Sequence, residues 1–431
     1  MKKYFFVCVL FILGVKTNLA QSKYKNVRID RQEEGVFSYP PCEPSIAINP
    51  KNPANVVAGA ILDRVYVSQD TGRTWVESTL KSGMGVFGDP CIVASNKGYF
   101  YYLHLSDPKG SGWGNERLLD RIVCQMSKDG GVSWTSGGGM GENHPKDQDK
   151  EWAACNQSGS RVCASWTQFD AYESKKTGDE SNILFSHSNC KAKKWKNAIQ
   201  INEVPGDCLD GDNTVEGAVP AYGPKGELYV SWALGDTIFF DRSTDGGKTW
   251  LTKDIRAAEI SGGWAQDIPG IMRCNGMPVL MCDLSDGVTR GNLYITWADT
   301  RNGADDTDIF FTSSSDGGNT WTPAKRINQD ISGKQQFFPW LAVDQSNGNL
   351  HIVYYDRRNY SDNKTDVFVA TSVDGGKTWS EEMISESPFD PDPTVFFGDY
   401  NNISAHNGIV RPIWTRCDKS KLSVWTALIQ K

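Results

Sequence analysis

The sequence has few histidines and, after its first residues, no long hydrophobic run. Its five histidines show no pairing with serine or cysteine that would indicate a nucleophilic triad, and no Cys-x-x-Cys or His-x-x-x-His pair indicates zinc.

Basic residues are not in excess, since the chain has 45 Lys and Arg but 52 Asp and Glu. Phosphate neutralisation needs a basic face, so no nucleic-acid partner is expected. No segment beyond the N-terminus is long enough to span a membrane.

The chain is rich in glycine and tryptophan, with 42 and 15 copies among 431 residues. This composition is typical of many turns between strands that carry large apolar anchors, and it favours β structure over a helical bundle. Charged residues make up 23% and hydrophobic residues 39%, which argues against a disordered chain.

The N-terminus has the pattern of a secretory signal. Lys2 and Lys3 precede an apolar run from Tyr4 to Val15, and Ala20 supplies a small residue for cleavage. We therefore expect a signal peptide over residues 1–20 and a single domain over residues 21–431. The protein is then secreted or periplasmic. The alternative is a buried N-terminal strand.

Ten cysteines follow the predicted signal, an even number in an exported chain, so disulfides are plausible. Two pairs have the spacing of a hairpin, Cys155 with Cys163 and Cys274 with Cys282. A third pair, Cys42 and Cys417, could join the two ends of the domain.

One motif, Ser-x-Asp-x-Gly-x-x-Trp, recurs along the whole chain. Its copies start at Ser68, Ser127, Ser243, Ser314 and Ser372, and a degenerate copy spans residues 186–195. Ser and Asp side chains can hold the backbone of a tight turn, glycine supplies positive φ, and tryptophan can pack against a neighbouring sheet. These aspartates are expected to stabilise turns, not to catalyse.

A second repeat, such as GELYVSW (226–232) and GNLYITW (291–297), precedes each turn and alternates as a half-buried strand does. With strands before and after, each unit has four antiparallel strands, which predicts a β-propeller. About 411 mature residues divided by a repeat of about 60 predict seven blades. The last blade lacks a strand, and we expect residues 25–30 to pair with the C-terminal strand and close the ring.

The five motif copies resemble the Asp-box, or bacterial neuraminidase repeat, propellers, which include sialidases and non-catalytic proteins. The resemblance covers nearly the whole mature chain. It implies a sialidase-like glycoside hydrolase, with a typical propeller of six blades as the alternative to seven. It further implies an arginine triad for a sugar carboxylate, a Tyr–Glu nucleophile pair and an Asp acid/base. Arg28-Ile29-Asp30 stands where sialidases carry Arg-Ile-Pro, so no family residue is assigned by motif.

Alignment of the second strands instead nominates residues on the face opposite the repeated turns. Asp299 and Asp356 are candidate catalytic carboxylates, and four arginines could converge on a sugar carboxylate or sulfate. These are Arg64, Arg301, Arg358 and Arg416. The alternative is that Asp299 pairs with Arg301, and Asp356 with Arg357 or Arg358, simply to hold loops.

A partial ring of carboxylates is expected where the first strands begin, nearest the axis: Glu43, Asp89, Asp149 or Glu151, Glu216, Asp267 and Asp399. Such a ring would be protonated or paired with cations, and it could supply a general acid. Among these residues, Glu216 and Asp267 are candidate catalytic groups and Asp399 a substrate contact. Tyr400 is a candidate nucleophile. The alternative is that the carboxylates bond loop amides.

The stretch from residue 207 to 216 is dense in oxygen ligands. Asp207, Asp210 and Asp212 could hold Ca²⁺, although no cofactor is required by the predicted chemistry. Together with the predicted signal peptide, the Asp-box resemblance implies an exported, sialidase-like propeller that acts as an exo-glycosidase on acidic, sialylated glycans. The alternative is a non-catalytic scaffold that binds glycans or proteins. Nothing in the sequence specifies the oligomeric state.

Overall fold

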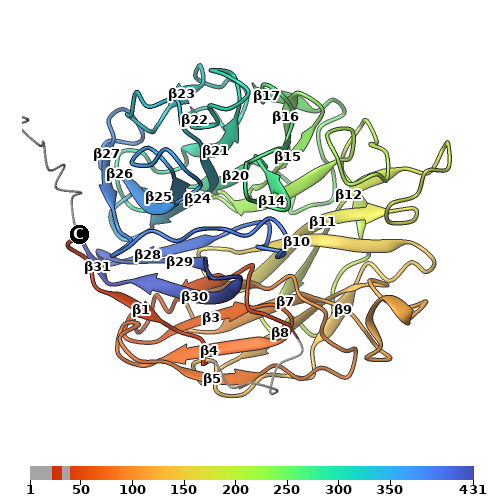
Figure 1. The fold of residues 1–431 in the computed structure, drawn as a ribbon. Helices are drawn as coiled ribbons and strands as arrows, with labels where there is room; N and C mark the ends of the chain where they lie inside the picture. The colour runs from red at the N-terminus through yellow and green to blue at the C-terminus, as the bar shows by residue number, and fades with distance from the viewer. Residues whose placement is uncertain (1–21, 32–38) are drawn as a thin grey trace, which may run out of the picture.

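The computed structural model describes residues 22–31 and 39–431 and is a seven-bladed β-propeller (Figure 1). Each blade is an antiparallel sheet whose four main strands follow one another outward from the axis. The predicted seven blades are confirmed, and the alternative of six is excluded. The predicted signal peptide, residues 1–20, lies outside the described residues.

The first three blades are formed in chain order. Blade 1 holds β2 (Ser45–Ile48), β3 (Val56–Ala60), β4 (Arg64–Ser68) and β5 (Val76–Thr79). Blade 2 holds β6 (Cys91–Ala94), β7 (Phe100–Leu105), β8 (Ile122–Ser127) and β9 (Gly138–Met140), with the short helix η1 (Gly112–Gly114) between β7 and β8. Blade 3 holds β10 (Asp147–Cys155), β11 (Arg161–Phe169), β12 (Ser181–Asn189) and β13 (Ile199–Gln200).

The next three blades repeat this order. Blade 4 holds β14 (Glu216–Tyr222), β15 (Leu228–Leu234), β16 (Thr237–Ser243) and β17 (Ile255–Glu259). A small hairpin of β18 (Ala265–Gln266) and β19 (Cys274–Asn275) precedes blade 5, which holds β20 (Val279–Cys282), β21 (Leu293–Asp299), β22 (Asp308–Ser314) and β23 (Lys325–Arg326). Blade 6 holds β24 (Gln336–Asp344), β25 (Asn349–Asp356), β26 (Asp366–Ser372) and β27 (Ser380–Met383).

Blade 7 is completed by both ends of the domain. Its strands β28 (Asn402–His406), β29 (Ile409–Asp418) and β30 (Lys421–Ala427) are joined by β1 (Asn26–Arg28), and β31 (Ile429–Gln430) pairs with the start of β29. Figure 1 shows β1, in red, alongside β30, in blue. Val27 is opposite Thr426, as the closing-strand hypothesis predicts. Pairing here covers two sheet edges.

The repeated motif forms the turn between the third and fourth strands. In the copy at Ser314, the serine hydroxyl donates to Asp316 at 2.8 Å and accepts from the Gly318 amide at 2.9 Å. Asp316 also accepts from the amide and hydroxyl of Thr320, and these bonds lower the pKa of Asp316 to about 2. The motif aspartates are thus turn-forming residues, as predicted.

The motif tryptophans join neighbouring blades. Trp250, Trp321 and Trp379 each pack edge-on against a phenylalanine of the preceding blade, at ring-centroid distances of 4.8, 5.2 and 5.2 Å. The second motif glycine approaches the same ring: a Cβ on Gly318 would lie 2.2 Å from Phe240. Glycine is therefore required there by both its positive φ of 86° and the inter-blade contact.

The ten cysteines in the described part of the chain are free thiols, so the three predicted disulfides are not formed in this structure. In the β10–β11 ladder, Cys163 is opposite Ala154, whereas Cys155 is opposite Val162. Since successive residues of a strand point to opposite faces, the two thiols lie on opposite faces of the blade. Also within the described residues, no helix is long and apolar enough to cross a membrane.

The closing strand is testable through Asp30, a buried carboxylate that accepts from the Val424 amide at 2.8 Å and from the Arg28 guanidinium. Asp30→Ala leaves the Val424 amide without its acceptor, so the free energy of unfolding should fall by about 1–3 kcal/mol. Arg31→Ala, one residue away and exposed, should change it by less than about 0.5 kcal/mol. Equal effects in urea unfolding would contradict the closure.

Candidate functional site

The candidate site lies at the mouth of the central channel, on the face opposite the repeated turns. First strands of all blades surround the axis, and three of them start with a β-bulge. The pairing register shifts between Asp149 and Trp152 in blade 3, between Glu216 and Val219 in blade 4, and between Phe337 and Trp340 in blade 6. Bulges change the direction of side chains and are common beside active sites.

Each bulge contains a residue with left-handed backbone. These residues are Lys150 (φ 54°), Gly217 (φ 73°) and Phe338 (φ 51°). Glycine adopts this conformation at little cost, but lysine and phenylalanine are strained by about 1–3 kcal/mol each. Strain held at equivalent positions by a rigid scaffold is a mark of a functional region, and Lys150 lies within it.

An ionic cluster is centred on Asp399, which is buried just before β28. Lys150 Nζ lies 2.5 Å from Asp399 Oδ2 and 3.3 Å from Asp89 Oδ2. The Arg273 guanidinium donates to both oxygens of Asp399, with Nε 2.9 Å from Oδ1. Arg273 Nη1 also lies 2.9 Å from Asp210 Oδ2. Lys150 comes from blade 3 and Arg273 from the connection between blades 4 and 5. Together they neutralise three aspartates from other parts of the ring: Asp89 before β6, Asp210 between blades 3 and 4, and Asp399 before β28.

Further carboxyl groups surround this cluster and favour the protonated form. Burial raises the pKa of Asp149 to about 7, with a contribution from the charge of Asp89. Burial also raises the pKa values of Glu43, Glu151 and Glu216 well above their usual range. By contrast, Lys150 and Arg273 outweigh burial and lower the pKa of Asp399 to about 2. The mouth therefore holds protonated acids next to an ionised one.

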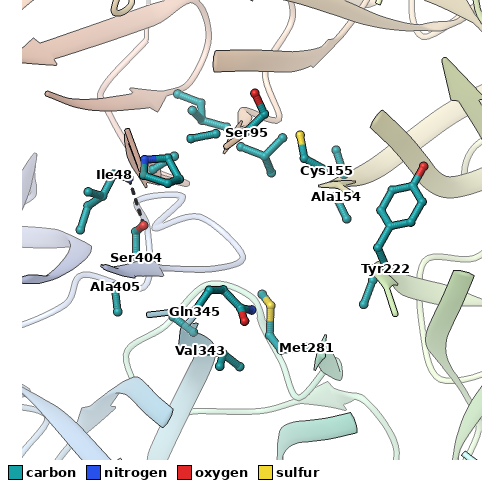
Figure 2. Close-up of a pocket in the computed structure, with 18 of the residues that line it drawn as sticks. Ile48, Ser95, Ala154, Cys155, Tyr222, Met281, Val343, Gln345, Ser404 and Ala405 are labelled. Atoms are coloured by element: carbon teal, nitrogen blue, oxygen red, sulfur yellow. Dashed lines mark hydrogen bonds between the residues drawn. The ribbon is translucent and has the colours of Figure 1, made fainter. Parts of the chain in front are cut away.

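An aromatic plug closes the channel beneath the cluster. Trp152 contacts Trp340 at a ring-centroid distance of 4.2 Å and Tyr400 at 4.9 Å. A small cavity of about 30 Å³ lies between the plug and Lys150 and Asp399. Beyond the plug, the channel widens into a cavity of about 320 Å³, lined by all seven first strands and open towards the repeated turns (Figure 2).

The structure does not bring the four predicted arginines together, because partners nearby in the fold engage each one. Arg64 pairs with Glu77 at 2.9 Å, Arg301 with Asp299 at 2.5 Å, Arg358 with Asp356 at 2.6 Å and Arg416 with Asp418 at 2.5 Å. Arg301 and Arg358 also lie over Phe310 and Phe368 of their own blades, at 4.2 and 4.4 Å from the ring centroids. The pairs of Arg301 and Arg358 are those of the loop-holding alternative, whereas Arg64 pairs with a glutamate of the outer strand β5.

The predicted catalytic residues occupy four environments. Asp299 and Asp356 are buried in the ion pairs just described, and burial raises the pKa of Asp356 to about 6. Asp267 is exposed in the connection after β18. Tyr400 belongs to the plug, where burial raises the pKa of its hydroxyl. Only Glu216 lies with the cluster around Asp399, and its carboxyl is 0% exposed without a hydrogen-bond partner among the described residues.

The predicted calcium ligands point to separate partners. Asp207 accepts from the Thr214 hydroxyl at 2.9 Å, Asp210 from Tyr172 at 2.6 Å and from Arg273, and Asp212 from the Ala265 amide at 2.8 Å. In residues 22–31 and 39–431, no three His, Cys, Asp or Glu side chains are grouped to hold a metal ion. Calcium binding by this segment stays a prediction.

Sequence reasoning did not identify Lys150 and Arg273, the two cations of the cluster. Lys150 stands between Asp149 and Glu151, so the alignment that found the carboxylates contained the signal. Arg273 lies beside β19 in a connection that repeats in no other blade. No periodic pattern could have selected it.

Lys150→Met tests the cluster, because it leaves the buried Asp399 and the partly buried Asp89 with one fewer cation. The free energy of unfolding should fall by about 3–5 kcal/mol at neutral pH. Lys146→Met removes a partly exposed lysine paired with Asp170 and should cost less than about 1 kcal/mol. If urea unfolding gave similar values for both variants, the cluster would not be the buried ionic centre described here.

Comparison with known proteins supports the fold. The chain matches no protein-family model and no curated protein. Among solved structures, an ulvan lyase of a new polysaccharide lyase family is similar with a TM-score of 0.56 and 11% identity, covering 94% of this chain and 96% of that one. The same lyase bound to -[GlcA(1-4)Rha3S]- gives a TM-score of 0.55. A protein of unknown function from Dyadobacter fermentans gives 0.51, with 12% identity over 95% and 98% of the two chains. At these identities the likeness establishes a shared propeller fold.

Proposed function

We propose that this protein acts on acidic glycans at the channel mouth. One observation carries the proposal: Asp149, a carboxyl whose pKa is raised to about 7, adjoins the Lys150–Asp399–Arg273 cluster on the loop-rich face. Glycosidases generally pair a protonated carboxyl with an ionised carboxylate. The buried mouth supplies both states at neutral pH, and its exposed edge supplies a cation for the substrate.

Arg273 is suited to binding the anionic group of a sugar. Its side chain is 41% exposed, and three of its five N–H donors bond to Asp399 and Asp210. Its other two N–H groups have no hydrogen-bond partner among the described residues. A guanidinium fork of this kind matches a carboxylate or sulfate. Asp149 would then donate a proton to the glycosidic oxygen as a general acid.

The narrower proposal, exo-acting hydrolysis of sialylated glycans, depends on the Asp-box resemblance. In this structure each of the four arginines pairs with an acid, and Tyr400 belongs to the plug. The ulvan lyase with the same fold was solved bound to -[GlcA(1-4)Rha3S]-, so this scaffold can carry a site for an acidic saccharide. Export of the protein, proposed from residues 1–20, would place it among extracellular glycans.

Non-catalytic glycan binding is the second candidate. The observation that favours it is the deep burial of the acids: Glu151 and Glu216 are at most 1% exposed, and their carboxyl oxygens have no partner among the described residues. Such groups can shape a site electrostatically without contacting a ligand. The two candidates differ in turnover, which a single set of assays can measure.

The proposal predicts selective binding of acidic glycans. On a panel of sialylated, uronate-containing, sulfated and neutral glycans, the wild-type protein should bind acidic members. Arg273→Ala should weaken that binding by roughly ten- to a hundredfold, since a charge-assisted fork is lost. Arg273→Lys keeps the charge and should restore part of it. Arg256→Ala, on the outer strand of blade 4, is the control and should bind as the wild type does. No preference for acidic glycans would refute the proposal.

Asp149 predicts a pH dependence. If it is the general acid, kcat/KM should fall as pH rises through about 7, and Asp149→Asn should lower kcat/KM by about 10²–10⁴-fold.

The pH dependence of stability gives an independent measure of the Asp149 pKa. The folded protein retains a proton that the unfolded chain releases above its ordinary pKa of 3.8, so the free energy of unfolding falls between pH 4 and 7. Asp149→Asn should reduce that slope. An unchanged slope would show that Asp149 is ionised; a reduced slope without turnover would favour non-catalytic binding.

A further inference from the structure

An exposed tryptophan stands beside the channel mouth. Trp113, in η1 between β7 and β8, is 68% exposed. Its ring stacks on Tyr172 at a centroid distance of 5.9 Å and an interplanar angle of 26°, and Phe87 contacts it edge-on at 5.8 Å. One aromatic face is thus supported by protein. Most of the remaining surface of the ring is open to solvent.

The loop that carries Trp113 is fixed from within. The buried Asp107 carboxylate accepts from the amides of Gly110 and Gly112, at 3.0 and 2.8 Å, and from the Asn115 side chain at 2.7 Å. A Cβ on Gly112 would lie 3.3 Å from the Phe87 ring, and this glycine has φ of 57°. The tryptophan is therefore held in place before any ligand arrives, which lowers the entropy cost of binding.

A continuous chain of contacts joins Trp113 to the ionic cluster. Its stacking partner Tyr172 donates its hydroxyl to Asp210 at 2.6 Å, and Asp210 accepts from Arg273 at 2.9 Å. Arg273 itself lies over Phe396, 5.3 Å from the ring centroid. Trp113 is thus linked to Arg273 through Tyr172 and Asp210. The partly exposed Arg273 is suited to an anion, and the exposed indole is suited to an apolar surface.

We infer that Trp113 forms a second sugar subsite, so that the ligand is an acidic oligosaccharide and not a single terminal sugar. This inference depends on the proposed function. One sugar places its carboxylate on Arg273, and a neighbouring sugar packs the C–H groups of its ring on the indole. An aromatic ring offers a large apolar face at low conformational cost, and sugar rings present such a face between polar edges. The substrate class is thus a chain of carboxylate-bearing sugars.

The test is the dependence of affinity on chain length. Calorimetry with galacturonic acid oligomers and sialic acid oligomers of one to six units should show affinity rising with length in at least one series for the wild-type protein. Trp113→Ala should bind the single sugar unchanged but lose the gain from length, roughly three- to tenfold for the longest oligomer. Trp113→Phe keeps an aromatic face and should retain most of the gain.

Val132→Ala is the matched control, because Val132 is exposed on a repeated turn of the opposite face and should leave every affinity unchanged. If the wild type binds but Trp113→Ala keeps the full gain from length, the subsite is refuted while the proposed function stands. If affinity does not rise with length in either series, the subsite is likewise refuted. If the wild type binds neither series and no other acidic glycan, the proposed function fails and the subsite with it.

Discussion

Contact between neighbouring blades is the interaction on which this structure depends. A four-stranded sheet of this kind has two apolar faces, and one blade alone could bury neither. The motif tryptophans and glycines bring each turn onto the preceding blade, as Trp321 and Gly318 do on Phe240. Such packing is cooperative around a ring, because every sheet requires both neighbours. In blade 7, β1 supplies the outer strand and pairs with β30.

Rigid closure allows the channel mouth to contain features that would be unfavourable elsewhere. Lys150 and Phe338 adopt left-handed backbone, and several carboxyl groups are buried within one cluster. Repulsion among these acids is relieved in two ways, by protonation of Glu43, Asp149, Glu151 and Glu216, and by the cations of Lys150 and Arg273. The surrounding blades hold this arrangement in place, so the cluster needs little reorganisation when a ligand arrives.

The fold could be predicted because its determinants are repeated. Blade number, the turn-forming role of the motif and the pairing of β1 with the C-terminal strand all follow from copies that align. The register of the first strands places most of the predicted carboxylates near the axis for the same reason. Asp267 is the exception, because the β18–β19 hairpin separates it from β20, the first strand of blade 5, and leaves it exposed. Alignment also nominated the arginines, but it left open whether Arg301 contacts a ligand or pairs with Asp299, as it does here.

The remaining parts of the site could not be predicted because they break the repeat. The bulge in blade 3 inserts the residue that turns Lys150 towards Asp399, and a bulge leaves little trace in a hydrophobic pattern. Arg273 and Trp113 belong to a connection and a loop that occur once. The disulfide hypothesis relied on an even cysteine count and on hairpin spacing, whereas the β10–β11 register puts Cys155 and Cys163 on opposite faces.

The plug of Trp152, Trp340 and Tyr400 divides the axis into two compartments with different chemistry. One holds the ionic cluster; the other is a chamber of about 320 Å³, lined by apolar and polar side chains, that opens on the far side of the ring. The three rings pack against one another between the two. Each end of the ring can therefore acquire its own ligand by local substitution without disturbing the opposite end.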